Sequence, residues 1–166
     1  MGSHDTVRLD SSFEAFHRAH RDRLVASLAL HLGNLDLATD AVDHAMAKAW
    51  GKWADMADPD DAGAWVYRVA LNWATSWLRR LRFRSRQPLP DTPTHDRSAG
   101  GDQSLRRALS GLSDDHRAVV VLRLLHEMST RETALALDIP EGTVKSRLAR
   151  ALDQLRSNLN ASEVRS

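Results

Sequence analysis

The sequence predicts an all-α protein, and three observations carry this prediction. Apolar residues recur at helical spacing over long stretches, as Phe13, Phe16, Leu24 and Leu28 do near the beginning. No sustained alternation of apolar and polar residues lies between hairpin turns, and the VVVL run at 119–122 sits inside a longer helical pattern. Glycine and proline interrupt these stretches at intervals. We therefore expect helices that pack through apolar stripes.

Three helical stretches form a first block, residues 12–86. Gly33 and Asn34 separate the first stretch from the second, whose apolar positions run from residue 38 to 53. An acidic segment, about 54–63, contains Pro59 and precedes the third stretch, whose apolar positions run from 65 to 81. Residues 1–11 are expected to be a tail, because the opening MGSH resembles the remnant of a cleaved expression tag.

A second block, residues 102–160, follows a linker at 87–101. The linker has three prolines and two glycines and could extend to roughly 50 Å at about 3.3 Å per residue, so the two blocks could sit well apart. The second block predicts four helices, about 103–111, 114–127, 130–137 and 140–159, with a tail at 161–166. Ser113 or Asp114 can cap the second of these helices, and Ser129 with Glu132 fits a capping box for the third.

Composition narrows the classes of function. The chain has 166 residues, a formal net charge of +1 and no cysteine. Any nucleic-acid surface must therefore come from local clusters of charge, and disulfides and thiolate metal sites are excluded. No signal peptide or membrane-spanning apolar run is present, so a soluble cytoplasmic protein without membrane insertion is expected.

The helix predicted at 140–159 has a distinctive outward face. At about 100° per residue, Val144, Leu148, Ala151 and Leu155 share one stripe, which predicts the buried side. The other side presents small residues flanked by cations, an arrangement that lets a backbone approach a DNA groove. With the short helix before it and a tight turn at Asp138, this pattern is typical of a helix-turn-helix. The turn favours a residue that tolerates a left-handed conformation, as Asp does.

Across residues 12–159 the sequence resembles bacterial RNA polymerase sigma factors of the extracytoplasmic-function (ECF) group, which keep sigma-70 regions 2 and 4. The segments LATDAVDHAMAKAW and AWVYRVALNWATSWLRR resemble region 2, and the stretch HRAVVVLRLLHEMSTRETALALDIPEGTVKSRLARALDQLR resembles region 4. The resemblance implies a sigma factor that binds core RNA polymerase, recognises and helps to open promoter DNA, and is held inactive by an anti-sigma protein. It implies neither enzymatic activity nor a cofactor.

The resemblance also implies three sets of site residues. The upstream promoter element is expected to contact Arg131, Lys145, Ser146, Ala149 and Arg150. The downstream promoter element is expected to contact Asn72, Ser76, Trp77, Arg79, Arg80 and Arg82. Core polymerase is expected to bind residues of the helix at about 36–53, namely Asp40, Asp43, His44, Met46 and Trp50. The acidic segment at 54–63 corresponds to a loop that captures a flipped base in this family.

The sequence departs from the family pattern at two places. Asp43 and His44 stand where relatives often have Gln and Glu, and Ser76 stands where they often have Asp. Two other functions therefore remain open: a helix-turn-helix regulator that is not a sigma factor, and a module that binds polymerase or another sigma factor without reading DNA.

Several residue groups have a structural alternative to a functional role. The five arginines of RRLRFRSR, residues 79–86, could be a solvated helix end that complements the helix dipole. Trp65, Trp73 and Trp77 could pack in a core instead of stacking on bases, and Arg147 could tie helices together. Glu14 and His17 have the spacing of di-iron helical bundles, but the second such motif is missing, so no metal is expected. No arrangement of residues predicts catalysis.

Overall fold

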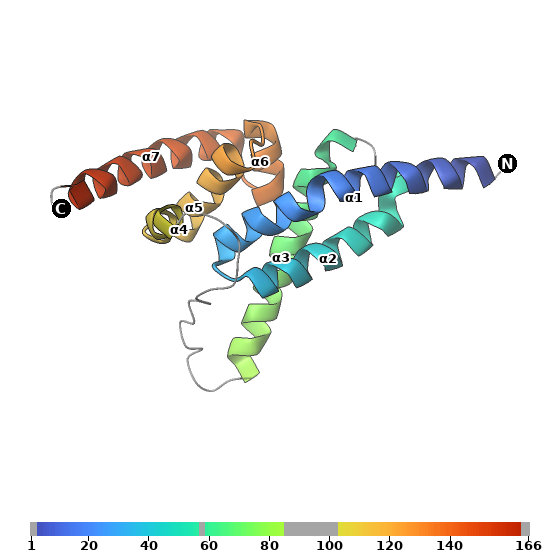
Figure 1. Ribbon diagram of the computed structural model, residues 1–166, viewed down its shortest axis with the longest axis horizontal. Helices are drawn as coiled ribbons and strands as arrows, with labels where there is room; N and C mark the ends of the chain where they lie inside the picture. The colour runs from blue at the N-terminus through green and yellow to red at the C-terminus, as the bar shows by residue number, and fades with distance from the viewer. Residues whose placement is uncertain (1–2, 57–58, 85–102, 164–166) are drawn as a thin grey trace.

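The computed structural model describes residues 3–56, 59–84 and 103–163, and these residues confirm the predicted helical class. The first block contains α1 (Ser3–Leu32), α2 (Leu35–Lys52) and α3 (Ala62–Arg84), with short 3-10 turns at Trp53–Asp55 and Pro59–Asp61 before α3. The second block contains α4 (Gln103–Ser110), α5 (Asp114–Val120), α6 (Thr130–Leu137) and α7 (Glu141–Glu163). Figure 1 shows their arrangement.

In the first block α1 and α2 form an antiparallel hairpin, against which α3 packs (Figure 1). The hairpin turns at Gly33, whose φ of +71° is easy for glycine, and the Asn34 side chain caps α2 by accepting from Leu37 N–H. Leu24, Leu28, Val42 and Tyr67 are fully buried among several small alanines. Because alanine side chains are small, the axes of the three helices can come close together, and the core between them is tightly packed.

Both ends of the fold differ from the sequence expectation. Helix α1 begins at Ser3, so most of the segment expected to be a tail is helical, and α7 continues to Glu163. The apolar pattern could not reveal these turns, because helix beyond the packed region needs no buried stripe.

The second block has the predicted helices with one change. Ser113 caps α5, and the capping box of Ser129 and Glu132 at the start of α6 is confirmed. The helix expected at 114–127 is α-helical only to Val120 and continues as a π-helical turn, Val121–Leu125. This turn ends where His126 N–H donates to Val121 O, and Glu127 then takes a positive φ of 60°.

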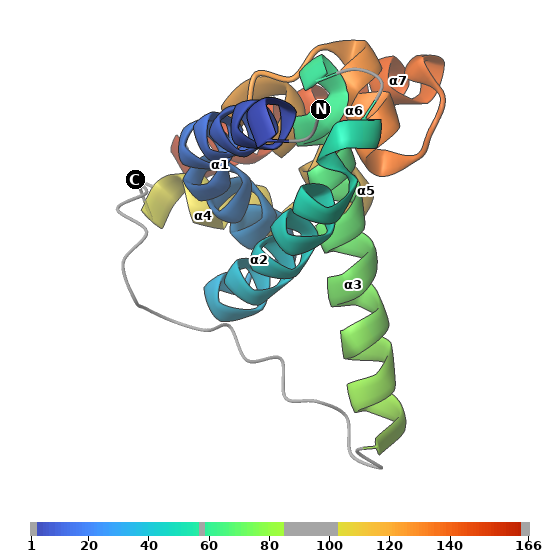
Figure 2. The ribbon, with the colours of Figure 1, turned by 90° about the vertical axis from the view of Figure 1, so that its right-hand side faces the viewer.

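The two blocks pack against each other instead of standing apart. Leu122, Met128 and Ala136 of the second block are buried in the same apolar cluster as the core of the first block. Helix α6 lies beside α3, and α1 contacts α5 and the π-helical turn (Figure 2). The other end of α3 projects away from both blocks in Figures 1 and 2. The linker at 87–101 lies outside the described residues.

Candidate nucleic-acid interface

The exposed face of α7 is the one that the sequence predicted. Val144 and Ala151 are fully buried, and Leu148 is half-buried in the core of the second block. Lys145, Ser146, Ala149 and Arg150 are exposed, and in the described part of the chain neither cation pairs with an acid. Helix α7 therefore presents two cations and two small residues to solvent on one side.

Arg147 has a structural role. Its guanidinium lies 2.8 Å from the Asp115 carboxylate of α5, and its side chain is mostly buried. The expectation that this arginine ties helices together is confirmed. Of the three cations at 145–150, only Lys145 and Arg150 are available to a ligand.

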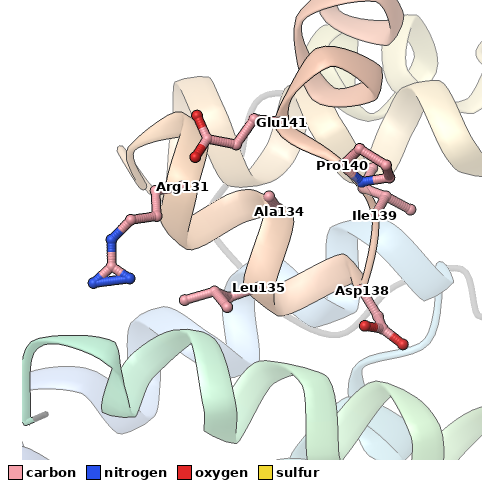
Figure 3. Close-up of a pocket in the computed structure, with 7 residues that line it drawn as sticks. All are labelled: Arg131, Ala134, Leu135, Asp138, Ile139, Pro140 and Glu141. Carbon is pink, nitrogen blue, oxygen red and sulfur yellow. The ribbon is translucent and has the colours of Figure 1, made fainter.

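The turn between α6 and α7 has helix-turn-helix geometry. Asp138 adopts the left-handed conformation (φ 55°, ψ 48°), as its place in the turn predicts, and Ile139 N–H donates to Ala134 O at 3.1 Å. Pro140 O accepts from Thr143 and Val144 N–H, so the proline directly precedes α7. A surface hollow of about 410 Å³ opens here (Figure 3), and it is lined by Arg131, Ala134, Leu135, Asp138, Ile139, Pro140 and Glu141.

Arg131 does not face solvent freely in this arrangement. Its two terminal nitrogens donate to both carboxylate oxygens of Asp61 in the first block, at 2.9 to 3.0 Å. Two further ion pairs join the blocks: Arg23 to Glu127 at 3.0 Å, and Arg68 to Asp138 at 3.9 Å. A residue expected to contact DNA is thus engaged by the acidic segment expected to hold a flipped base.

Buried histidines lie along the boundary between the blocks. A hydrogen bond of 2.9 Å joins His126 Nδ1 to Ser27 Oγ of α1, and these two residues are 7% and 4% exposed. His31 Nδ1 lies 2.9 Å from the Tyr67 hydroxyl, and Arg117 of α5 donates to His31 O. The pKa of both His31 and His126 is lowered to about 4, mainly by burial, and at His126 the charge of Arg23 contributes to this lowering. Both imidazoles are therefore neutral at pH 7.

On α3, most of the residues expected at the downstream element are exposed. Asn72, Arg79, Arg80 and Arg82 are exposed, and Ser76 is half-buried and accepts weakly from Arg79 at 3.4 Å. Trp77 is 39% exposed, whereas Trp65 and Trp73 are half-buried and pack against the core. The core-packing alternative therefore describes Trp65 and Trp73 and not Trp77.

On α2, three of the residues expected to bind polymerase are exposed. These are Asp40, Asp43 and Trp50, and the Trp50 side chain is 47% exposed. Asp43 accepts from Arg21 of α1 through both carboxylate oxygens, at 2.7 and 2.9 Å, and His44 stacks against Trp73. Asp43 therefore contacts α1, and His44 contacts α3.

Met46 corrects the expectation for this surface. It is 3% exposed and belongs to the core of the first block, so it has no surface to offer to polymerase. Met46 lies in the buried stripe of α2 together with Val42, Ala45 and Ala49, whereas Trp50 is outside it. Met46 supports the helix from inside.

The acidic segment before α3 is only partly described. Residues 57 and 58 of this segment lie outside the described residues. Asp61 is mostly buried by its pairing with Arg131. In this arrangement the segment does not present Asp61 to a base.

Residues 3–56, 59–84 and 103–163 contain no group of three or more His, Asp or Glu side chains placed to hold a metal ion. Within the same ranges, no helix has the length and apolar content needed to cross a membrane.

Together, a packed helical core, a helix-turn-helix with an exposed cationic face and a second exposed arginine-rich helix define a two-part DNA-binding protein. Comparison with known proteins gives the family. Residues 16–84 match the family described as Sigma-70 region 2, and residues 102–155 match the family described as Sigma-70, region 4. The RNA polymerase sigma-E factor of Streptomyces coelicolor is 36% identical over 159 residues, covering 92% of this chain and 88% of the relative.

A second relative and two solved structures agree. The ECF RNA polymerase sigma factor SigM of Mycobacterium tuberculosis is 32% identical over 147 residues, covering 87% of this chain and 75% of the relative. The sigma factor RpoE of Bartonella quintana, solved with the anti-sigma factor NepR, superposes with a TM-score of 0.71 at 23% identity, over 90% of this chain and 97% of that one. CnrH, solved in complex with the cytosolic domain of CnrY, superposes with a TM-score of 0.65 at 25% identity, over 92% of this chain and 90% of that one.

The chain belongs to the ECF sigma factors of the sigma-70 family. This membership supports a sigma factor over a helix-turn-helix regulator of another kind. Sequence reasoning missed the contacts between the blocks. The residues that make these contacts, such as Ser27 and His126, belong to no pattern in the sequence that distinguishes them from other serines and histidines.

Proposed function

We propose that this ECF sigma factor directs core RNA polymerase to promoters through two separate exposed helix faces, one on α7 and one on α3. The observation that carries the proposal is the face of α7, where Lys145 and Arg150 have no acidic partner in the described chain and flank small residues. An ordinary solvated face would carry long side chains throughout, whereas this one lets the helix backbone approach a groove.

The face of α7 suits the upstream promoter element. Arg150 can donate two hydrogen bonds to a guanine edge, and Lys145 at the margin of the face can reach a phosphate. Ser146 and Ala149 lie between them and leave room for the base edges. Because α5 holds Arg147 through Asp115, the helix has a fixed rotation relative to its domain. That fixed rotation would define which side chains meet the bases.

The exposed face of α3 suits the downstream element. Asn72 and Ser76 carry hydrogen-bonding groups that can distinguish bases, and Trp77 has a half-exposed indole that can stack on one. Arg79, Arg80 and Arg82 lie farther along the helix, where they can bind phosphates. Phosphate contacts position the protein and add salt-dependent affinity, while the polar residues supply sequence preference.

We assign the exposed side of α2 to the contact with core polymerase. Trp50 offers a large apolar surface, and Asp40 and Asp43 lie on the same helix. Large aromatic side chains ringed by charge are the usual centres of protein interfaces. His44 is half-buried against Trp73, so we assign it to the edge of this surface.

The packed arrangement of the two blocks would have to open before both faces bind one promoter. Arg131 and Asp61 satisfy each other here, and each is assigned to DNA. A linker of fifteen residues can span the separation that two promoter elements require. We assign the packed form to the free or inhibited protein, in keeping with the similar fold of the sigma factor RpoE, which was solved in complex with the anti-sigma factor NepR. The setting for this function is the bacterial cytoplasm.

Run-off transcription with purified core polymerase tests the proposal. Transcripts with defined 5′ ends should appear from genomic DNA fragments only when the protein is added. DNA binding without any core-dependent transcript would refute the sigma-factor assignment, and so would core binding without initiation.

A further inference from the structure

A buried histidine of the second block is held by the first block. His126 follows the π-helical turn and is 7% exposed, and its Nδ1 lies 2.9 Å from Ser27 Oγ of α1. Ser27 itself is 4% exposed. The imidazole also forms a hydrogen bond with the backbone of Arg23. Both of these hydrogen bonds reach α1, so His126 would lose them if the two blocks separated.

Basic side chains flank the His126 ring on the side of α1. His20, Arg23 and Ser27 follow one another at intervals of three and four residues, so they lie on one face of α1. The charge of Arg23 and a charge on His20 both disfavour a proton on His126. His20 is half-buried and stacks on Phe16, with ring centroids 4.7 Å apart, and burial together with the charge of Arg23 lowers its pKa. A proton on either ring would therefore bring like charges together at the boundary.

The acidic groups near the ring are engaged by other partners. Glu127, the next residue in the chain, pairs with Arg23 at 3.0 Å. Glu132 of α6 favours a proton on His126, but it accepts from Ser129 N–H at 2.7 Å in the capping box. Each carboxylate is thus committed to another group, and a buried charge without a close partner is costly. A charged imidazole therefore disfavours the packed arrangement, whereas water can solvate it in the open one.

We propose that His126 and Ser27 form an acid-sensitive latch, in which a proton taken up by His126 releases the second block from the first. Release would also free Arg131, which the packed form pairs with Asp61. This inference rests on the proposed function, which assigns the packed form to the free or inhibited protein, and it adds a signal that opens that form.

The direction of the effect follows from the two arrangements. The pKa of His126 is about 4 in the packed form and returns to its ordinary 6.5 when the ring is exposed to water. The open form therefore binds the extra proton as the pH falls below about 6.5. The contribution of His126 to the packed form is complete above that pH and is lost as the solution becomes more acidic.

Cysteine labelling can measure how often the blocks separate. The chain has no cysteine, so Met128→Cys introduces a single thiol at a position that is 5% exposed and buried in the apolar cluster shared with the first block. Its rate of reaction with a pyridyl disulfide, divided by the rate for the same chain unfolded in urea at the same pH, gives the open fraction. Val42→Cys and Val144→Cys, at two fully buried positions, report in the same way on unfolding of the first and the second block.

The labelling of Met128→Cys should rise about 20-fold from pH 7 to pH 5 through His126 alone. Adding His126→Gln should largely remove this rise, because a glutamine side chain does not titrate. His31→Gln is the matched control. The pKa of His31 is lowered to the same value, but its hydrogen-bond partner Tyr67 belongs to the first block, so the rise should persist. Labelling at residues 42 and 144 should stay much slower than at residue 128 at both pH values.

The outcomes separate the latch from the proposed function. Labelling of Met128→Cys that does not depend on pH would overturn the latch, and so would a rise that survives His126→Gln. Equal labelling at all three positions would mean that acid unfolds the whole chain, which also overturns the latch. If run-off transcription with core polymerase fails, the proposed function is refuted whatever the labelling shows. If transcription succeeds and the labelling is independent of pH, the role of His126 alone is refuted.

Discussion

The hydrogen bond between Ser27 and His126 offers a direct way to shift the packed arrangement toward the open one. Both groups are nearly inaccessible to water, and they come from different blocks. Ser27→Ala would leave the His126 ring nitrogen buried without its partner, at a cost of about 1 to 3 kcal/mol to the packed form. In the open form residue 27 would face solvent on α1, where alanine is a better helix former than serine. The ratio of packed to open protein should therefore fall about 5- to 150-fold.

The assay uses the absence of cysteine from this chain. Cysteines introduced at exposed Ala47 on α2 and exposed Ser157 on α7 can carry a fluorophore pair for distance measurement. With rising urea the separation of the labels should begin at a lower concentration in Ser27→Ala than in the wild type. Ser110→Ala is the control, because Ser110 is exposed and bonds only to Arg107 O within α4. An unchanged opening midpoint in Ser27→Ala, with the same unfolding midpoint for each block, would refute the reasoning.

Three further results are expected. Arg150→Ala should weaken binding to a specific promoter by about 1 to 3 kcal/mol in a competition assay and leave binding to random DNA nearly unchanged; loss on both would make Arg150 a phosphate contact. Met46→Ala should lower the free energy of unfolding by about 2 to 5 kcal/mol in urea titrations with little effect on polymerase affinity. Trp50→Ala should weaken binding to core polymerase with little effect on the free energy of unfolding. Acidification from pH 7 to pH 5 should remove about 2 kcal/mol of stability through His31, whose pKa rises from about 4 to its ordinary 6.5 on unfolding, so that the unfolded chain binds the extra proton; the same shift at His126 adds a similar loss, so His31→Gln should reduce this dependence by about half, and an unaltered pH profile would contradict it.

Much of the fold follows from local signals in the sequence. The boundaries of α6 depend on Ser129 and Glu132 at one end and on the left-handed Asp138 at the other, and all three act within a few residues of themselves. The phase of α7 follows from Val144 and Ala151, because one helical stripe can face only one core. The π-helical turn after α5 has no such local signal, since it depends on where the chain must turn toward Met128.

The sequence could predict a site residue only where the apolar pattern of one helix alone determines whether that residue is exposed or buried. The exposed face of α7 is of this kind. Met46 is not, because whether it faces outward depends on how α1 and α3 close over α2. The pairing of Arg131 with Asp61 joins residues seventy positions apart, and no pattern within either helix indicates it.

The most direct test of the central claim, that α7 and α3 read two separate promoter elements, is core-dependent run-off transcription from a promoter altered at one element at a time. Arg150→Ala should reduce transcription from the intact promoter and from one altered downstream, and add little to the defect of one altered upstream. Asn72→Ala should show the converse pattern. If both variants lowered transcription from all three templates by the same factor, the two helix faces would not be reading separate elements, and the account would be contradicted.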